Sequence, residues 1–292
     1  MERRSFLKKI MVSAAVLMLG VNAVNAKQIN WPDEITFGVI PVAGTQEMEN
    51  TFGKLASYLQ KKLGIKVKLV LPSDYTGVIV GMAHKHIDLA YFGPKSYCEA
   101  AKRANAEAIA TEISAESGTP GYYSIIITKK GSGLKTLADL KGKKWAFTDP
   151  QSTSGTLVPS VMFAKKGINP QTYFSKVIYS GSHEFSILDV KFGKVDAAST
   201  NNLDFNRGLG KQWKKSDFNI IWKSDLLPGS PIAVRKDLPE TLKLAIKGAL
   251  ISYDDRENLN KMKILGYAPA NDSMYNGVRE LIKFKESLNK KN

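Results

Sequence analysis

Short apolar runs alternate with amphipathic stretches along most of this chain, and this alternation limits its fold more than any other feature. Residues 34–41 (EITFGVIP) are typical of a strand, and residues 45–64 are typical of an amphipathic helix that ends at a glycine. The same order is predicted again over residues 65–106 and 122–200, and a C-terminal helix is predicted at residues 239–255. Strands joined by helices form mainly parallel sheets that helices cover, so the sequence predicts an α/β fold.

The predicted elements fall into two groups, and glycine and proline mark both joins. The chain passes from one group to the other near residues 117–121 (SGTPG) and returns near residues 227–231 (LPGSP). We therefore expect two three-layer α/β lobes, the first built from residues 27–118 plus 230–292 and the second from residues 119–229. Ligands of open α/β sheets bind beyond the carboxyl ends of the strands, so the cleft between the lobes is the expected site.

Residues 1–26 differ from the rest of the chain. A basic start (MERRSFLKKI) is followed by the apolar run MVSAAVLMLGV, and small residues occur at Ala23 and Ala26. This pattern predicts a signal peptide that is too short for a stop-transfer span. Residues 3–9 (RRSFLKK) favour a twin-arginine signal, with a general secretory signal as the alternative. Because no later stretch reaches the about 18 apolar residues of a membrane helix, we expect a soluble protein in the periplasm.

Positive charge dominates the sequence, with a formal net charge of +15 at pH 7. Loss of residues 1–26 removes four basic residues and one acidic residue, which leaves +12. Such a surface could attract nucleic acid, an anionic membrane or small anions. Export argues against nucleic acid, and so do lysines that are scattered without aromatic or arginine clusters.

Cysteine and histidine give no sign of a disulfide or of a metal site. The single cysteine, Cys98, cannot form an internal disulfide, and it lies far from the signal cleavage region, which argues against a lipid anchor there. His84 and His86 have no third metal-ligand residue type beside them, so we expect both on the surface.

Hydroxyl and amide side chains are concentrated in residues 149–159 (DPQSTSGTLVP), between a predicted strand end and an apolar run that could begin a helix. Unpaired N–H groups at a helix start, together with serine and threonine hydroxyls, can bind an anion. The same residue types also cap ordinary helices. The stretch alone leaves both interpretations open.

Five segments that follow one another along the chain resemble the periplasmic phosphonate-, phosphite- or phosphate-binding proteins of ABC importers. They are PSDYTGVIVGM (72–82), GTPGYYSIIITKK (118–130), DPQSTSGTLVP (149–159), YSGSHEFSILDVKFGKVDAA (179–198) and IWKSDLLPGSPIAVRKDLPE (221–240). The resemblance implies a two-lobed Venus-flytrap fold whose lobes close on one small phosphorus oxyanion. It also implies a monomer without cofactor or catalytic residues, which presents its closed form to an inner-membrane permease with its ATPase.

The resemblance further implies which residues bind the ligand. Ser152, Thr153 and Ser154 match the anion-binding hydroxyls of the family, and Gly155 would let the backbone approach the ligand oxygens. His183 matches the ligand-facing histidine, at a helix start where the positive end of the dipole points to the anion. An imidazole can donate to an oxyanion oxygen in either charge state.

Tyrosines are implied to approach the ligand from both lobes. Tyr75 and Tyr122 match the ligand-facing tyrosines of the family, and a phenol can donate to an oxygen. For the neighbouring Tyr123 a position in the core is an equal interpretation. Tyr91 and Asn201, each near a predicted strand end, are further candidates.

Two positions depart from the family members that take aminoalkylphosphonates. Those proteins meet the ligand's ammonium with acidic side chains, whereas the matching residues here are Ser230 and Leu203, with Asp204 one position further along. A buried ammonium that loses its carboxylate partner is destabilised by roughly a few kcal/mol. We therefore expect a hydroxyl contact from Ser230 and a preference for phosphate, phosphite or a small alkylphosphonate.

Two other functions stay open from the sequence alone. A secreted serine hydrolase could use Ser152 or Ser154 with His183 and Asp189, although the G-x-S-x-G motif is missing. A protein that hands its liganded form to a membrane sensor would share every feature described so far.

Overall fold

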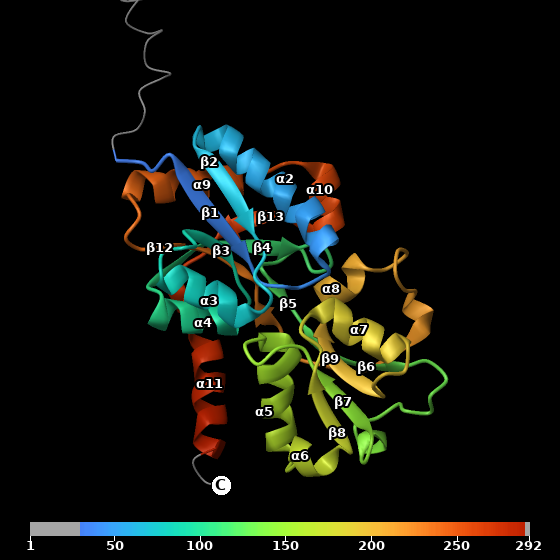
Figure 1. Cartoon of the computed structure of the whole chain (residues 1–292). Coiled ribbons are helices and arrows are strands. Elements are labelled where there is room, and N and C mark those ends of the chain that lie inside the picture. The colour runs from blue at the N-terminus through green and yellow to red at the C-terminus, as the bar shows by residue number, and fades with distance from the viewer. Residues whose placement is uncertain (1–29, 290–292) are drawn as a thin grey trace, which may run out of the picture. The chain divides into compact units, whose positions relative to one another are not determined.

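Two mixed β-sheets are the framework of residues 30–289, which the computed structural model describes (Figure 1). Helices pack on both sheets, and a two-stranded ribbon lies where the chain crosses between them. The predicted signal peptide, residues 1–26, lies outside the described residues. Within the described part, no helix combines the length and the apolar character that a membrane crossing requires.

The first sheet has six strands in the order β13-β4-β12-β3-β1-β2 among the described residues. Its first strand β1 pairs in parallel with β2 and β3, whereas β12 and β13 pair antiparallel with their neighbours. The strands are β1 (Glu34–Val39), β2 (Lys66–Val70), β3 (Leu89–Tyr91), β4 (Ala106–Ser114), β12 (Pro231–Arg235) and β13 (Ile264–Pro269). The accompanying helices are α2 (Thr45–Leu63), α3 (Tyr75–Ala83), α4 (Pro94–Arg103), α9 (Glu240–Ile251), α10 (Arg256–Met262), η5 (Asp272–Tyr275) and α11 (Asn276–Asn289).

The second sheet has five strands in the order β10-β6-β9-β7-β8 within the same described range. The strands β7, β8 and β9 run parallel, and β6 pairs antiparallel with β9 and β10. The strands are β6 (Ser124–Lys129), β7 (Lys144–Phe147), β8 (Lys176–Tyr179), β9 (Ala197–Asn201) and β10 (Phe218–Lys223). The helices are η2 (Ala138–Leu140), the π-helical turn η3 (Thr153–Leu157), α5 (Val158–Lys165), α6 (Pro170–Tyr173), α7 (His183–Lys191), α8 (Asn202–Arg207) and η4 (Lys215–Asp217).

Strand β6 shows why the second sheet is buried on both faces. Ile125 and Ile127 pack into one core cluster with Ile187 of α7, whereas Ile126 packs into another with Trp145 and Phe163. Successive side chains of a strand point to opposite faces, so an unbroken isoleucine run requires a core on each side. Both cores hold the strands in register, which places the carboxyl ends of β7 and β9 at the cleft.

Two adjacent crossings connect the sheets. The ribbon strand β5 (Gly121–Tyr122) leads from β4 to β6, β11 (Leu227–Pro228) leads from β10 to β12, and the two pair antiparallel. We call the six-stranded sheet with its helices lobe one and the five-stranded sheet with its helices lobe two. The strands of each sheet fall within the residues predicted for that lobe. The residue boundaries themselves stay a prediction.

Helix α11 does not follow this division. It belongs to the C-terminal segment assigned to lobe one, yet it packs against α5 of lobe two as well as against α4 (Figure 1). Lys285 Nζ lies 3.3 Å from Ser160 Oγ, and Lys165 Nζ lies 5.9 Å from the centre of the Phe284 ring. The C-terminal helix therefore contacts both lobes.

Sequence interpretation missed elements at several places along the chain. The helix predicted at residues 239–255 corresponds to α9, and it is not C-terminal, because α10, β13 and α11 follow it. Strand β13 contains Gly266 and Pro269, which are weak strand formers, and it is stabilised by pairing with β4. Strands β4 and β12 and helices α6 and α8 were not predicted either. The helix predicted from residue 156 begins earlier, as the π-helical turn at Thr153.

Candidate functional site: an anion cavity between the lobes

Several helix starts meet at one cavity between the lobes. Tyr75 is the first residue of α3, Thr153 of η3 and His183 of α7, while Gly93 and Asn201 directly precede α4 and α8. All five residues line the cavity. The N–H groups of a first helical turn have no partner within their helix and carry partial positive charge, so the arrangement favours an anion.

The cavity is small. Its volume is about 20 Å³, and a cavity of about 10–15 Å³ can hold one water molecule. Ile40, Val42 and Leu203 contribute apolar wall, and most of the remaining lining is polar. A space of this size does not admit a large organic cofactor.

Most of the predicted ligand-binding residues line this cavity. They are Tyr75, Tyr91, Tyr122, Ser152, Thr153, His183, Asn201 and Ser230. Ser154 and Gly155 are buried beside it without lining it. The structure thus brings the predicted residues of both lobes together, while their contact with a ligand stays a prediction.

Two buried hydroxyls near the cavity have no hydrogen-bond partner among residues 30–289. They are the phenol of Tyr75 and Oγ of Ser154, both on side chains that are almost wholly buried. Burial raises the pKa of Tyr75 well above its usual value, so the phenol keeps its proton and can donate it. A buried polar group without a partner is costly, and such groups are rare outside sites that bind water, ions or ligands.

Ser152 and Thr153 already accept hydrogen bonds. Ser152 Oγ accepts from the N–H of Gly155 at 3.0 Å and so caps η3, as the ordinary interpretation of this stretch expects. Thr153 Oγ1 accepts from the N–H of Lys95 at 2.8 Å, which joins lobe two to the start of α4 in lobe one. A hydroxyl that accepts can still donate its own proton. Helix capping and ligand binding are therefore compatible in both residues.

Gly155 has a packing reason to be glycine. A Cβ at this position would lie 2.1 Å from Thr148 Oγ1 and 2.3 Å from Thr148 Cβ. The turn can therefore approach β7 only without a side chain here. Close approach of the backbone to a ligand is a further role that the sequence suggested, although Gly155 does not line the cavity.

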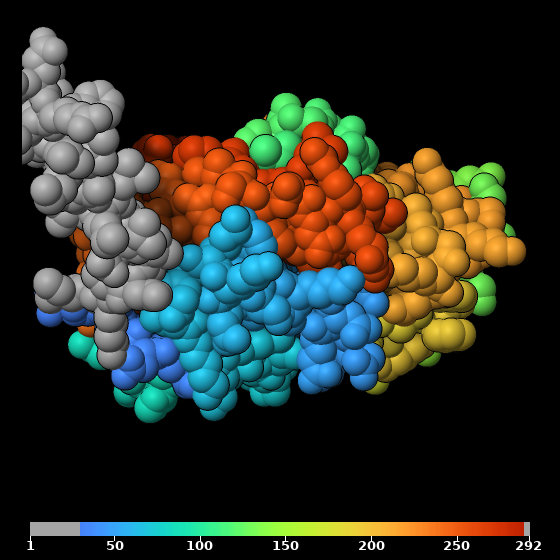
Figure 2. Space-filling model, turned by 90° about the horizontal axis from the view of Figure 1, so that it is seen from above, coloured from blue at the N-terminus to red at the C-terminus, as the bar shows by residue number. Residues whose placement is uncertain are grey.

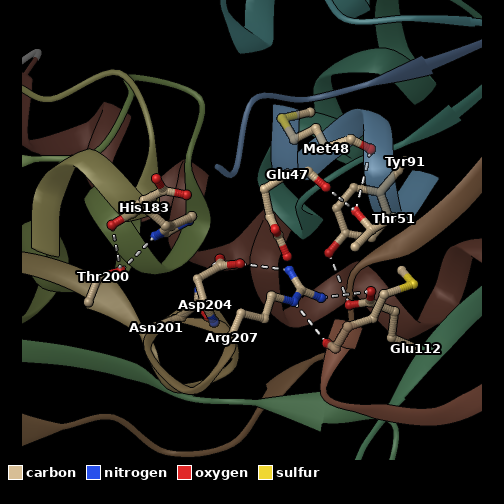
Figure 3. Close-up of polar contacts among 12 residues, drawn as sticks. Glu47, Met48, Thr51, Tyr91, Glu112, His183, Thr200, Asn201, Asp204 and Arg207 are labelled. Atoms are coloured by element: carbon tan, nitrogen blue, oxygen red, sulfur yellow. Dashed lines mark hydrogen bonds and ion pairs between the residues drawn. The ribbon is translucent and has the colours of Figure 1, made fainter. Parts of the chain in front are cut away.

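His183 lies among hydroxyl groups. Its Nδ1 is 3.1 Å from Thr200 Oγ1 (Figure 3). Nδ1 is also 3.4 Å from Thr148 Oγ1, and Nε2 is 3.4 Å from Ser152 Oγ. Burial lowers the pKa of His183 below its ordinary value, which favours the neutral imidazole near pH 7. A neutral ring carries one N–H, so His183 offers the cavity at most one donor.

Arg207 is the main residue that sequence interpretation missed. It lines the cavity and lies between two carboxylates, with Nη1 at 2.6 Å from Asp204 Oδ1 and Nη2 at 3.1 Å from Glu112 Oε1 (Figure 3). Glu112 Oε2 also accepts from the phenol of Tyr91 at 3.0 Å. Burial raises the pKa of Glu112; burial alone would lower the pKa of Arg207, but the two carboxylates hold it above its usual value. Prediction of α8 would have placed Arg207 about two turns after a cleft-facing strand end.

The geometry argues against the hydrolase alternative. Asp189 Oδ2 accepts from Ser180 Oγ at 2.9 Å, and Oδ1 pairs with Lys194 at 3.1 Å. The nitrogens of His183 bond to hydroxyls, so Asp189 does not orient the ring as a catalytic triad requires.

His84 and His86 are exposed, and the described residues contain no group of three potential metal ligands.

Comparison with known families places the chain. Residues 37–275 match the family described as "ABC transporter, phosphonate, periplasmic substrate-binding protein". The chain belongs to this family. Members of this phosphonate-binding family are substrate-binding components of transporters, so the family predicted from the sequence is confirmed.

Individual relatives agree with this assignment. The phosphonates-binding periplasmic protein of Escherichia coli is 36% identical over 263 residues, which cover 86% of this chain and 77% of that protein. The phosphate-import protein PhnD of Mycolicibacterium smegmatis is 29% identical over 86% of this chain and 85% of that protein. The crystal structure of a binding protein component of an ABC phosphonate transporter from Pseudomonas aeruginosa has a TM-score of 0.82 at 31% identity, covering 87% of this chain and 86% of that one. The predicted two-lobed α/β fold of periplasmic binding proteins is thereby confirmed.

Proposed function

We propose that this protein captures a small phosphorus oxyanion in the periplasm and delivers it to a membrane permease that works with an ATPase. The observation that carries the proposal is the buried, unpartnered phenol of Tyr75 in the wall of a cavity at which helix starts meet. A tetrahedral oxyanion offers several acceptor oxygens at short distance from one another. It would therefore satisfy the Tyr75 hydroxyl, which nothing else in the described chain satisfies.

The ligand class follows from the wall of the cavity and from the relatives. Their names assign phosphonates to the Escherichia coli protein and phosphate to the mycobacterial one. In this chain Ser230 lines the cavity with a hydroxyl and Leu203 with an apolar side chain. Neither carries the negative charge that an ion pair with an ammonium group requires. We therefore favour phosphate, phosphite or a short alkylphosphonate over an aminoalkylphosphonate.

Capture requires the lobes to open and close. The paired strands β5 and β11 form the short connection at which a few residues can change their backbone angles. Several hydrogen bonds join the lobes around the cavity, among them the one from Lys95 N–H to Thr153 Oγ1. The described structure therefore corresponds to a closed arrangement, and ligand should shift the protein toward it.

A binding panel tests the proposal. Calorimetry and thermal shift with phosphate, phosphite, methylphosphonate, aminoethylphosphonate and sulfate should show saturable binding of at least one phosphorus oxyanion without turnover. Small-angle scattering should show compaction with that ligand. Tyr75→Phe keeps the ring and removes only the unpartnered hydroxyl, so it is the matched control for binding in the cavity. Failure of every phosphorus oxyanion to bind would overturn the assignment.

A further inference from the structure

Arg207 connects the two lobes directly beside the anion cavity. It lies at the end of α8 in lobe two, and its guanidinium donates to Glu112 of β4 and to the carbonyl of Met262 at the end of α10, both in lobe one. The bond to Glu112 is 3.1 Å long and the bond to Met262 is 2.8 Å long. The side chains of Arg207 and Glu112 are 14% and 1% exposed, so this ion pair is shielded from water.

Asp204 is the acidic residue in the cavity lining, and both of its oxygens are occupied. Oδ1 accepts from Arg207 Nη1 at 2.6 Å, and Oδ2 accepts from Asn201 Nδ2 at 2.6 Å (Figure 3). Each oxygen keeps a second acceptor site, but the positive guanidinium beside the carboxylate weakens its attraction for a ligand ammonium. The guanidinium, which Asp204 shares with Glu112, also offsets part of the repulsion of Asp204 on a bound anion.

We propose that Arg207 is a positioning residue that links lobe closure to ligand charge. In the closed protein its contacts with Glu112 and Met262 hold the guanidinium against Asp204. The cavity then accepts an oxyanion despite a carboxylate in its wall, and it rejects a ligand that needs this carboxylate for an ammonium. The inference rests on the proposed function and deepens it by naming what selects against aminoalkylphosphonates.

The position of Arg207 supports this role. Arg207, Asp204 and Val42 line the anion cavity and also an adjoining cleft whose other walls include Glu47 and Lys211. The ion pair thus separates the cavity from the outer part of the junction. Figure 2 shows the segments near residues 50 and 260 side by side, with the segment near residue 210 against them. Opening of the lobes would part Arg207 from Glu112 and Met262.

The neighbouring pair of Lys211 and Glu47 provides a matched control. It also joins the lobes, at 3.1 Å, but its side chains are 48% and 35% exposed. Exposed pairs contribute little, whereas removal of one member of a buried pair leaves an uncompensated charge. The two pairs cross the same junction and differ mainly in burial.

The test measures methylphosphonate and aminoethylphosphonate affinities by calorimetry in four proteins: the parent, Arg207→Gln, the double variant Asp204→Asn/Arg207→Gln, and Lys211→Gln. Arg207→Gln should weaken methylphosphonate binding by about tenfold or more, because Asp204 then repels the anion. The double variant should regain most of the loss. Lys211→Gln should bind as the parent does. Aminoethylphosphonate should lose less than methylphosphonate in Arg207→Gln, because Asp204 is free to accept the ammonium.

Three results would overturn the inference: parent-like methylphosphonate affinity in Arg207→Gln, a double variant that binds no better than the single one, or an equal loss in Lys211→Gln. If Arg207→Gln does not fold, Glu112→Gln is the second variant to test, because it keeps the ion pair of Arg207 with Asp204. The dissociation rates of methylphosphonate and aminoethylphosphonate should both rise in Glu112→Gln, by the same factor. Unchanged dissociation rates would contradict the link to lobe closure. The measurement on the parent protein tests the proposed function separately. If the parent binds no phosphorus oxyanion, the proposed function is wrong, whatever the variants do.

Discussion

Two helix starts in lobe two lie at the same cavity, one with neutral hydroxyl groups and the other with charged side chains. Residues 152–154 begin η3 with neutral hydroxyls, and Ser154 Oγ is buried without a partner in the described chain. Helix α8, which follows its N-cap Asn201, carries Asp204 and Arg207, and both charges are paired. The comparison teaches that unsatisfied neutral donors are available to a ligand, whereas satisfied charges hold the walls of its site.

The largest effect on ligand affinity is expected from a carboxylate introduced among the neutral side chains of the cavity wall. Ser230→Asp adds an unpaired charge to the lining, where a hydroxyl now lies. Methylphosphonate affinity should fall by roughly several kcal/mol through like-charge repulsion, while aminoethylphosphonate should lose far less. Calorimetry with both ligands measures the effect, and Ser230→Asn controls for size. A parent that already prefers aminoethylphosphonate by about tenfold would contradict the assignment of Ser230.

The next largest effect is expected on stability, from Gly155→Ala in the π-helical turn η3. The new methyl group would overlap Thr148 at 2.1 Å, so the turn must move away from β7. We expect a loss of about 3 kcal/mol in the free energy of unfolding, at the upper end for overpacking. Denaturant titration measures it, with Gly53→Ala as control because no atom lies within 4 Å of a Cβ there. Equal stability of the two variants would show that the contact with Thr148 is not restrictive.

Tyr75→Phe should separate ligand binding from stability. Its phenol has no partner within residues 30–289, so the folded protein loses no hydrogen bond with it. Oxyanion affinity should fall by about tenfold, or about 1.4 kcal/mol, while the melting temperature without ligand stays the same or rises. Tyr97→Phe is a useful contrast, because Tyr97 donates to Asp272 at 2.7 Å and should lose stability instead. Parent affinity in Tyr75→Phe would remove Tyr75 from the site.

The smallest expected effect concerns the pH dependence of stability. Burial lowers the pKa of His183 from its ordinary value of 6.5, so below that pH the unfolded chain takes up a proton more readily than the folded one. The contribution of His183 is therefore fully present above pH 6.5 and is lost as the pH falls through the range below it. Melting curves of the ligand-free protein should show a drop between about pH 7.5 and about pH 5.5 that is smaller in His183→Gln. Identical drops in both proteins would contradict a buried neutral His183.

The sequence was most informative where local pattern decides structure. The alternation of apolar runs predicted most strands of the two sheets, although not β4 or β12, and the hydroxyl-rich stretch at residues 149–159 predicted a polar helix start. It was least informative for β13, whose glycine and proline form a strand only because β4 supplies a partner. The C-terminal helix α11 likewise gains its place from contacts with both lobes.

What the sequence determined by itself was the α/β fold, the family and most residues that line the cavity, because strand and helix periods and short motifs are local properties. Only the tertiary structure decided which hydroxyls stay unpaired, why residue 155 is glycine, and that Asp204 is neutralised. Arg207 and Glu112 are 95 positions apart in the chain, and their pairing exists only because β4 and α8 meet across the junction of the lobes. Charge pairing of this kind depends on distances of a few ångströms between segments that no local pattern connects.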